Sequence, residues 1–536
     1  MKEKLIELIN QALKANNITD NAEIQIETPS NKENGDYASN IAMKLAGYLH
    51  QSPMTIANLL LPYLKSPNIA KVTIANPGFI NFYLSKDYLL DNINNVISLN
   101  EQYGSSTIGQ GQNYNIEFVS ANPTGILHMG NARGGAYGDS LARILRFSGY
   151  NVTEEYYVND AGNQINNLAL SILARYKEEC GEEAEIPENG YHGQEIVTIA
   201  HDLYKNHQNK LLTEPLTYFK DLGTEILLNK IKEVLKEYRI NFDLYTSEKS
   251  IYAKHPLPEM LEKLKNSGYS YEKDGALWLK SSELGDDKDH VLVKADGSYT
   301  YLVPDIAYHI DKISRGFTHL VDVFGTDHHG YVARLKGSLK ALGYDDNILD
   351  VKLLQLVRLV ANGEEIKMSK RTGKTVSLQE LLDLVGVNAS RYFFAMHSLD
   401  TQMDFDLELA QKNSNENPVF YVSYAYARIC TILKNYSELK KITEYKTITS
   451  NDAYNVLEQI YKFPEIVASA ATKELPHLIT NYVYNLASSF HLYYSNNRII
   501  TDDEEQTMEN LNLIKAVQIT IKNSLNLIGV IPPEKM

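Results

Sequence analysis

The stretch that decides the fold spans residues 113–131 and reads NYNIEFVSANPTGILHMGN. Its apolar run at 114–119 predicts a buried strand, and a turn follows at 122–125. A helix is expected over 128–148, and residues 152–158 predict the next strand. Strand, turn, helix and strand form one βαβ unit, the building block of a parallel nucleotide-binding sheet.

The rest of the chain predicts a multidomain α/β protein in three parts. Residues 1–110 mix helical and strand spacing, so we expect a small α+β domain. Residues 111–400 hold the parallel sheet, with a helical, charge-rich insertion at about 165–290. Residues 401–536 show helical spacing only, and we expect an all-α bundle there. Further strands are expected at 276–280, 290–294, 299–302 and 319–324, with an apolar run at 353–360.

Length and composition exclude several classes of protein. The chain has 536 residues, enough for several domains of roughly 100–200 residues each, and no apolar run reaches the roughly 18–20 residues of a membrane span. Acidic residues and short apolar steps in residues 1–17 argue against a signal peptide. Two cysteines, Cys180 and Cys430, cannot form an all-cysteine zinc site or a disulfide framework, so we expect a reduced, cytoplasmic protein without a structural metal. The net charge of −15 argues against a nucleic-acid partner, because such partners favour basic surfaces. This argument is weak, since the sum can hide local basic tracts.

The first chemical motif, PTGILHMGN at residues 123–131, lies at the expected helix start. Unpaired backbone N–H groups and the positive helix end suit anionic phosphates there, and Gly130 would let a nucleotide approach the backbone closely. His128 and Asn131 share one face of the first turn, and both can donate hydrogen bonds to phosphate oxygens. Taken alone, the motif also fits an incidental helix start with a surface histidine.

The second motif, KMSKRTG at residues 367–373, lies in a polar loop. Lys367 and Lys370 flank Met368 and Ser369, and the two ammonium groups can close over a triphosphate. A lysine can also neutralise the charge that develops on pyrophosphate when the α-phosphorus is attacked. Taken alone, the pattern also fits a solvated basic loop.

Together and in this order, the two motifs resemble the HIGH and KMSKS signatures of class I aminoacyl-tRNA synthetases. Longer stretches resemble the arginyl-tRNA synthetase family within that class. They read EFVSANPTG at 117–125, YVNDAGNQ at 157–164, GDDKD at 285–289, GTDHH at 325–329 and NPVFYV at 417–422. GDYA at 35–38, PGFIN at 77–81 and PPEKM at 532–536 are similar too, so the resemblance spans essentially the whole chain.

The resemblance implies a Rossmann-type catalytic core, an N-terminal tRNA-contacting domain and a helical anticodon-binding domain. It implies that L-arginine is activated with ATP, accompanied by Mg²⁺, and transferred to the 3′-terminal adenosine of tRNA(Arg). It also implies that bound tRNA is required for the activation step. His128, Asn131 and Lys370 are the expected catalytic residues, and ATP is expected at these three and at Gly130, Lys367, Met368 and Ser369. We expect a monomer with no membrane partner.

The same resemblance assigns the arginine pocket. It points to Glu117 and Asp305 as the carboxylates that face the guanidinium, with Tyr301 beside them, because that planar group needs acceptors in its plane. Ser120 and Asn122 would hold the α-amino and carboxylate groups of arginine. The apolar flanks of Glu117 predict that it is buried; the alternative is a surface carboxylate at a strand end.

Three features depart from the simplest pattern. Asn131 stands where the first signature usually has histidine, so its role should be positioning only, because an amide cannot carry a proton charge. Arg371 replaces the final serine of the commonest second signature, as it often does in this family. The sequence Asp327-His328-His329 could be mistaken for a metal site, but adjacent histidines point apart, which favours a packing or ATP-site role.

Two alternatives remain at this point. Cysteinyl-tRNA synthetases have similar signatures, but that family needs a cysteine-rich zinc site that two distant cysteines cannot supply. A non-catalytic tRNA-binding relative is the other alternative, and the intact motifs together with Glu117 and Asp305 argue against it.

Overall fold

The computed structural model describes residues 1–536 apart from residues 20–21, 30, 255–256, 327–328, 367–375 and 437–438. The chain divides into two compact units. The first comprises Met1–Tyr103, Ile429–Lys462 and Ser488–Thr520, and the second comprises Gly104–Arg428, Phe463–Ala487 and Ile521–Met536. Each unit therefore combines segments that are far apart in the sequence.

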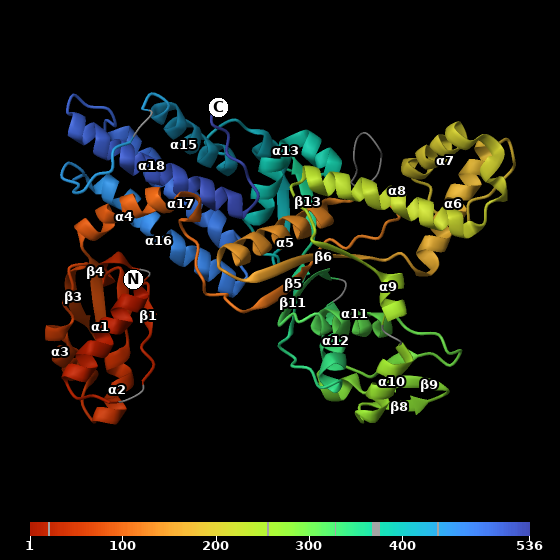
Figure 1. Ribbon diagram of the computed structural model, residues 1–536, viewed down its shortest axis with the longest axis horizontal. Coiled ribbons are helices and arrows are strands. Elements are labelled where there is room, and N and C mark those ends of the chain that lie inside the picture. Colours follow the sequence, from red (N-terminus) through yellow and green to blue (C-terminus); the bar gives the residue numbers. More distant parts are fainter. Residues whose placement is uncertain (20–21, 30, 255–256, 327–328, 367–375, 437–438) are drawn as a thin grey trace. The chain divides into compact units, whose positions relative to one another are not determined.

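A five-stranded parallel sheet forms the centre of the second unit (Figure 1). Its order is β12-β11-β5-β6-β7. The strands are β5 (Asn113–Glu117), β6 (Asn151–Val158), β7 (Leu244–Ser247), β11 (His319–Gly325) and β12 (Leu349–Leu354). The strand order reverses between β5 and β11, and doubly wound sheets bind ligands at the carboxyl ends of the strands at such a point. The expected Rossmann-type core is confirmed.

Helices cover both faces of this sheet (Figure 1). Helix α5 (Met129–Phe147) lies on one face, and α11 (Leu302–Ser314) and α12 (His329–Ala341) lie on the other. Glycine allows the close approach of α5, because a Cβ at Gly138 would come within 2.2 Å of the Phe118 ring. Side chains alternate along a strand, so Glu117 points to the opposite face, towards α11.

The chain between β6 and β11 forms two separate additions to the sheet. Helices α6 (Gly162–Glu179), α7 (Gln194–His207) and α8 (Leu216–Glu237) come first, and they share an apolar core of their own. After β7 follow α9 (Glu248–Lys254), α10 (Leu257–Asn266) and the antiparallel strands β8 (Ser270–Lys273), β9 (Ala276–Leu279) and β10 (His290–Val293). Strand β7 therefore divides the stretch that the sequence indicates as one insertion.

The strand expected at 299–302 is wrong. Tyr299 forms only an isolated bridge with Val293, and α11 already begins at Leu302. Leu302, Val303 and Ile306 are buried in α11 at helical spacing. Pro304 fits the first turn of the helix, where its missing N–H needs no partner.

The expectation of helices alone after residue 400 is also wrong in one detail. Strand β15 (Met403–Asp406) pairs in parallel with β13 (Val357–Ala361), and β14 (Glu364–Glu365) completes this small sheet. Residues in β15 are alternately buried and exposed, which is the period of a strand.

Apart from β15, the described elements after residue 376 are helices, as expected for the C-terminal part. They are α13 (Leu378–Ala395), α14 (Leu407–Gln411), α15 (Pro418–Leu433), α16 (Asn451–Lys473), α17 (His477–Asn496) and α18 (Glu504–Leu527). Among the described helices, none is both long and apolar enough to cross a membrane.

The N-terminal part of the first unit is an α+β domain, as expected. Its antiparallel sheet has the order β1-β2-β4-β3. The strands are β1 (Ile26–Glu27), β2 (Tyr37–Ser39), β3 (Ile69–Ala75) and β4 (Phe79–Leu84). The helices are α1 (Lys2–Ala15), α2 (Ile41–Leu49), α3 (Pro53–Leu60) and α4 (Lys86–Leu99).

Candidate active site

The turn after β5 has an unusual backbone conformation. Val119 and Ser120 have positive φ values of 67° and 35°, which non-glycine residues, and β-branched ones above all, adopt rarely. Strand β6 holds the turn in place. The backbone N–H of Tyr157 donates to Ser120 Oγ at 3.0 Å, and the Tyr156 hydroxyl donates to the carbonyl of Ala121 at 2.6 Å. Backbone strain of this kind concentrates at functional sites.

Ser120 and Asn122 both make hydrogen bonds within the protein. They are the residues predicted to hold the α-amino and carboxylate groups of the substrate arginine. Ser120 accepts from Tyr157, and Asn122 Nδ2 donates to Gln164 Oε1 at 2.7 Å. Each side chain keeps further bonding capacity for a ligand, because a hydroxyl also donates and an amide oxygen also accepts.

The first motif caps the start of α5. His128 is the N-cap residue; its Nδ1 accepts from the backbone N–H of Gly130 at 3.2 Å, and Asn131 Oδ1 accepts from the N–H of His128 at 3.0 Å. Partial burial lowers the pKa of His128, so the ring is neutral with its proton on Nε2. His128 Nε2–H and Asn131 Nδ2 are therefore the donors that the cap leaves available to phosphate.

The second motif, residues 367–373, lies outside the described residues, but the chain from residue 376 onward is anchored beside the first motif. Ser377 forms an antiparallel bridge with His128, and the backbone N–H of Leu378 donates to the carbonyl of Leu127 at 2.8 Å. The described chain after residue 375 thus lies directly next to the first motif.

Arg133 supports this arrangement, and the sequence analysis missed it. Its guanidinium is buried and donates to the carbonyls of Gln355 at 2.9 Å, Ser398 at 2.6 Å and Thr401 at 2.8 Å. These carbonyls precede β13 and β15, so Arg133 ties the start of α5 to the small sheet whose hairpin leads into the second motif.

Glu117 is buried, as predicted, but it already has a cationic partner. Lys312 on α11 donates to Glu117 Oε2 at 2.7 Å and to Asp322 Oδ1 at 2.9 Å, and His309 Nε2 lies 2.7 Å from Asp322 Oδ2. Burial raises the pKa of Glu117. Burial alone would also raise the pKa of Asp322, but Lys312 and His309 together hold that pKa below its usual value. The signal that was overlooked is Asp322 itself, a charge in the middle of an apolar strand.

Asp305 and Tyr301 have different surroundings. Asp305 lies in the first turn of α11 and accepts a hydrogen bond from the hydroxyl of Tyr331 on α12. Burial raises the pKa of Asp305, and among the described residues no cation forms an ion pair with it. Tyr301 precedes the helix and is 85% exposed, so its side chain is not packed beside Asp305 in this structure.

Three family models match the chain in the order of its parts. "Arginyl tRNA synthetase N terminal domain" matches residues 3–84, "tRNA synthetases class I (R), catalytic domain" matches 92–393, and "DALR anticodon binding domain" matches 422–536. The chain is also 49% identical to arginine--tRNA ligase 1 of Halalkalibacterium halodurans, over 100% of this chain and 99% of that protein.

The chain belongs to the arginyl-tRNA synthetase family. Arginine--tRNA ligase of Bacillus subtilis is similar to it at 47% identity, over 100% of this chain and 99% of that protein. The solved structure of Thermus thermophilus arginyl-tRNA synthetase has the same fold, with a TM-score of 0.78 at 21% identity over 100% of both chains. The family predicted from the motifs is confirmed, and the cysteinyl alternative is wrong.

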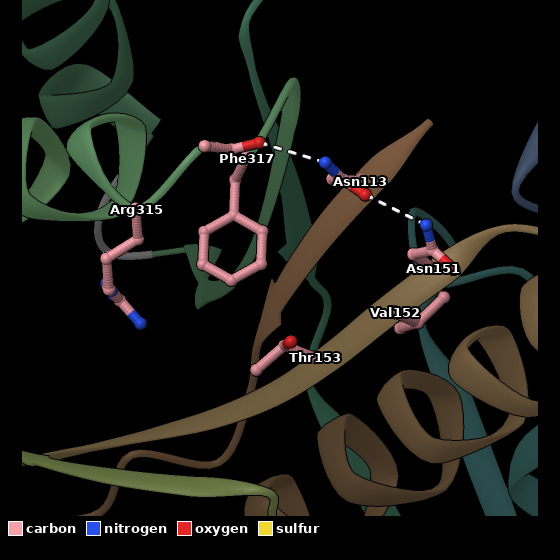
Figure 2. Close-up of a pocket in the computed structure, with 7 residues that line it drawn as sticks. Asn113, Asn151, Val152, Thr153, Arg315 and Phe317 are labelled. Atoms are coloured by element: carbon pink, nitrogen blue, oxygen red, sulfur yellow. Dashed lines mark hydrogen bonds between the residues drawn. The ribbon is translucent and has the colours of Figure 1, made fainter. Parts of the chain in front are cut away.

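A hollow of this chain lies at the amino ends of the sheet strands, away from the first motif. Figure 2 shows Asn113, Asn151 and Arg315 lining a hollow of about 400 Å³. Asn113 and Asn151 are the first residues of β5 and β6, and Asn151 Nδ2 donates to Asn113 Oδ1 at 3.0 Å. The hollow therefore opens at the amino ends of the strands, opposite the edge that carries both the first motif and Glu117.

Among the described residues, one group of side chains has the spacing that could hold a metal ion. Ligand atoms of Asp286, Asp287 and His290 lie within 4.8 Å of one another, but Asp286 already contacts His290 at 3.2 Å and Arg334 at 3.4 Å. The Arg334 guanidinium thus already supplies positive charge to Asp286. Asp327 and His328 lie outside the described residues, as does the side chain of His329.

Proposed function

We propose that the chain is an arginine--tRNA ligase, which activates L-arginine with ATP and transfers it to the 3′-terminal adenosine of tRNA(Arg). One observation carries the proposal. At the point where the strand order reverses, the capped start of α5 follows the strand that ends at Glu117. The Lys312 ammonium binds Glu117 and also interacts electrostatically with the Asp305 carboxyl. A helix N-terminus suits the phosphates of ATP, and carboxylates suit a guanidinium.

The chemistry needs no nucleophile from the enzyme. The arginine carboxylate attacks the α-phosphorus of ATP, the bond to pyrophosphate breaks, and arginyl-adenylate forms. A hydroxyl of the terminal ribose then attacks the adenylate carbonyl, and AMP leaves. Positioning and charge stabilisation are sufficient for both steps, and Mg²⁺ arrives with the phosphates of ATP.

The ATP site in this proposal uses both motifs. His128 and Asn131 donate to phosphate oxygens, and Gly130 lets the nucleotide approach the backbone. Lys370 neutralises the leaving pyrophosphate, and Lys367, Met368 and Ser369 complete the loop over the nucleotide. The anchoring of the chain after the second motif beside His128 supports this arrangement.

The arginine site uses Glu117 and Asp305 for the guanidinium, and Ser120 and Asn122 for the α-amino and carboxylate groups. Tyr301 joins the site only after its side chain turns inward from its exposed position. Loops that close over substrate on binding are common in enzymes of this kind.

The regions that precede and follow the catalytic part in the sequence bind the tRNA. In this proposal residues 1–110 contact tRNA, residues 111–400 carry the chemistry, and residues 401–536 bind the anticodon arm. Tyr426 is buried, whereas Tyr421 and Tyr424 are half-buried, so of these three tyrosines on α15 only Tyr421 and Tyr424 expose part of their rings. Exposed aromatic rings can stack on splayed anticodon bases. We further propose that the enzyme is a cytoplasmic monomer.

ATP–pyrophosphate exchange, run with each amino acid and with or without tRNA, tests the proposed function. Exchange should depend on arginine, and it should require tRNA. Exchange with a different amino acid, or none with arginine plus tRNA, would refute the proposal.

A further inference from the structure

A buried lysine pairs with one of the two carboxylates that are proposed to bind arginine, and it lies on the helix that carries the other. Lys312 is 0% exposed, and its ammonium bridges Glu117 and Asp322. Glu117 and Asp322 are register partners on the adjacent strands β5 and β11, so the lysine joins both strands where the strand order reverses. Lys312 also follows Asp305 by seven residues, two turns along α11, and therefore holds the helix that carries Asp305 against the strand that carries Glu117.

His309 supplies a second positive charge to this cluster. Its Nδ1 lies 2.8 Å from the carbonyl oxygen of Asp305, and its Nε2 lies 2.7 Å from Asp322 Oδ2. Both partners can only accept, so both ring nitrogens carry protons. Burial alone would lower the pKa of His309, but Asp322 raises it.

Counted over these five described residues, the cluster is therefore one positive charge short. Three carboxylates, on Glu117, Asp305 and Asp322, face two cations, on Lys312 and His309. Glu117 and Asp322 have cationic partners within 3 Å, whereas Asp305 has the neutral hydroxyl of Tyr331. Burial and the neighbouring Asp305 raise the pKa of Tyr331, which keeps that hydroxyl protonated.

We propose that Lys312 is a positioning residue for arginine. It keeps Glu117 ionised and correctly oriented, and of the three carboxylates on Glu117, Asp305 and Asp322 it leaves Asp305 without an ion-pair partner among the described residues, so that Asp305 can pair with the guanidinium. The inference rests on the function proposed above. Without Lys312, two carboxylates would face each other across β5 and β11, and two such groups cannot both stay ionised near neutral pH. One of them would take up a proton, and Glu117 would lose its charge or its orientation.

Other titratable or charged groups also face the cluster. They are Glu155 and Tyr157 on β6, Glu248 on α9, Tyr308 and Arg315 on α11, and Tyr331 and Arg334 on α12. Glu155 is paired with Arg315 at 2.8 Å, and so it does not compete for Lys312.

The test is steady-state ATP–pyrophosphate exchange by the full-length enzyme with tRNA present, comparing wild type with Lys312→Met. The variant should raise KM for arginine by up to about 100-fold, the scale of a misplaced contact, and leave KM for ATP unchanged. The ratio of variant to wild-type KM for arginine should fall as pH rises through the pKa of the proton shared by Glu117 and Asp322, because both carboxylates are then ionised. A role in folding alone would not produce this pH dependence.

Two further variants serve as controls. Lys312→Arg keeps the charge and should restore most of the arginine affinity. Lys352→Met removes a mostly buried lysine elsewhere in the same sheet, paired with Asp350 and Glu474, and should leave KM for arginine unchanged. If Lys312→Met does not fold, the double variant Lys312→Met/Asp322→Asn removes one charge of each sign and should still raise KM for arginine while KM for ATP is unchanged, because Glu117 has lost the ammonium that orients it.

The inference is overturned if the folded variant keeps a wild-type KM for arginine. It is also overturned if KM for arginine and for ATP rise together without pH dependence. A wild-type enzyme that does not activate arginine would instead refute the proposed function, so the two failures are distinguishable.

Discussion

Replacing Asp305 by asparagine removes one negative charge from the first turn of α11 and keeps the side-chain shape. The amide oxygen can still accept the hydrogen bond from Tyr331, so packing against α12 should survive. A hydrogen bond to a charged group contributes about 1.5–3 kcal/mol, and a loss of about 2 kcal/mol corresponds to a roughly 30-fold rise in KM for arginine. KM for ATP should stay near the wild-type value.

The same substitution should not destabilise the enzyme without substrate. Burial raises the pKa of Asp305 above its value in the unfolded chain, so the protonated carboxyl stabilises the folded state relative to the unfolded one. That contribution to stability is lost as pH rises through the raised pKa. Asparagine resembles the protonated form. Near neutral pH the variant should therefore melt at the wild-type temperature or above it, and added arginine should raise that temperature less than in wild type.

ATP–pyrophosphate exchange with tRNA present and thermal melting with and without arginine measure these two effects. Asp311→Asn is the matched control, because Asp311 lies on the same helix but pairs with Arg315 at 2.9 Å. A normal KM for arginine in Asp305→Asn, or an equal rise in the control, would show that the pocket has been placed wrongly.

Three other predictions test the remaining parts of the proposal. Lys370→Ala should slow arginyl-adenylate formation by roughly 10²–10³ while arginine binding changes little, and weaker arginine binding at unchanged turnover would contradict the role at pyrophosphate. Arg391→Met should lower the free energy of unfolding by about 3–5 kcal/mol in urea titrations, because Arg391 is fully buried and contacts the Asp139 carboxylate. Breaking the exposed pair of Arg358 with Asp404 should lower it by less than about 1 kcal/mol. Equal losses of stability in the two variants would contradict this prediction. Footprinting of bound tRNA should show a protected anticodon loop, and an accessible loop beside a protected acceptor end would remove the anticodon role from residues 401–536.

The local elements of the core could be predicted because their signals are contiguous. The apolar run of β5, the turn after it and the helical spacing of α5 lie within one short stretch, so both elements were located to within two residues at each end. The strand wrongly expected at 299–302 shows the limit of such signals. Short apolar runs suit a strand and a buried helix start equally well, and only the packing of α11 decided between them.

Strand β15 was missed for a related reason. Its four residues alternate between buried and exposed, but a strand this short is ambiguous until a partner is known. The partner, β13, lies more than forty residues earlier in the chain.

By itself, the sequence determined the chemical class of this protein, because each motif is a continuous run whose residue types suit phosphate or guanidinium. It also predicted that Glu117 is buried. Only the tertiary structure decided what neutralises that charge. Lys312 is 195 positions away, and Asp322 faces Glu117 because β11 lies next to β5. The order of strands in a sheet follows from how all the elements pack together, so no local pattern could reveal this neighbour.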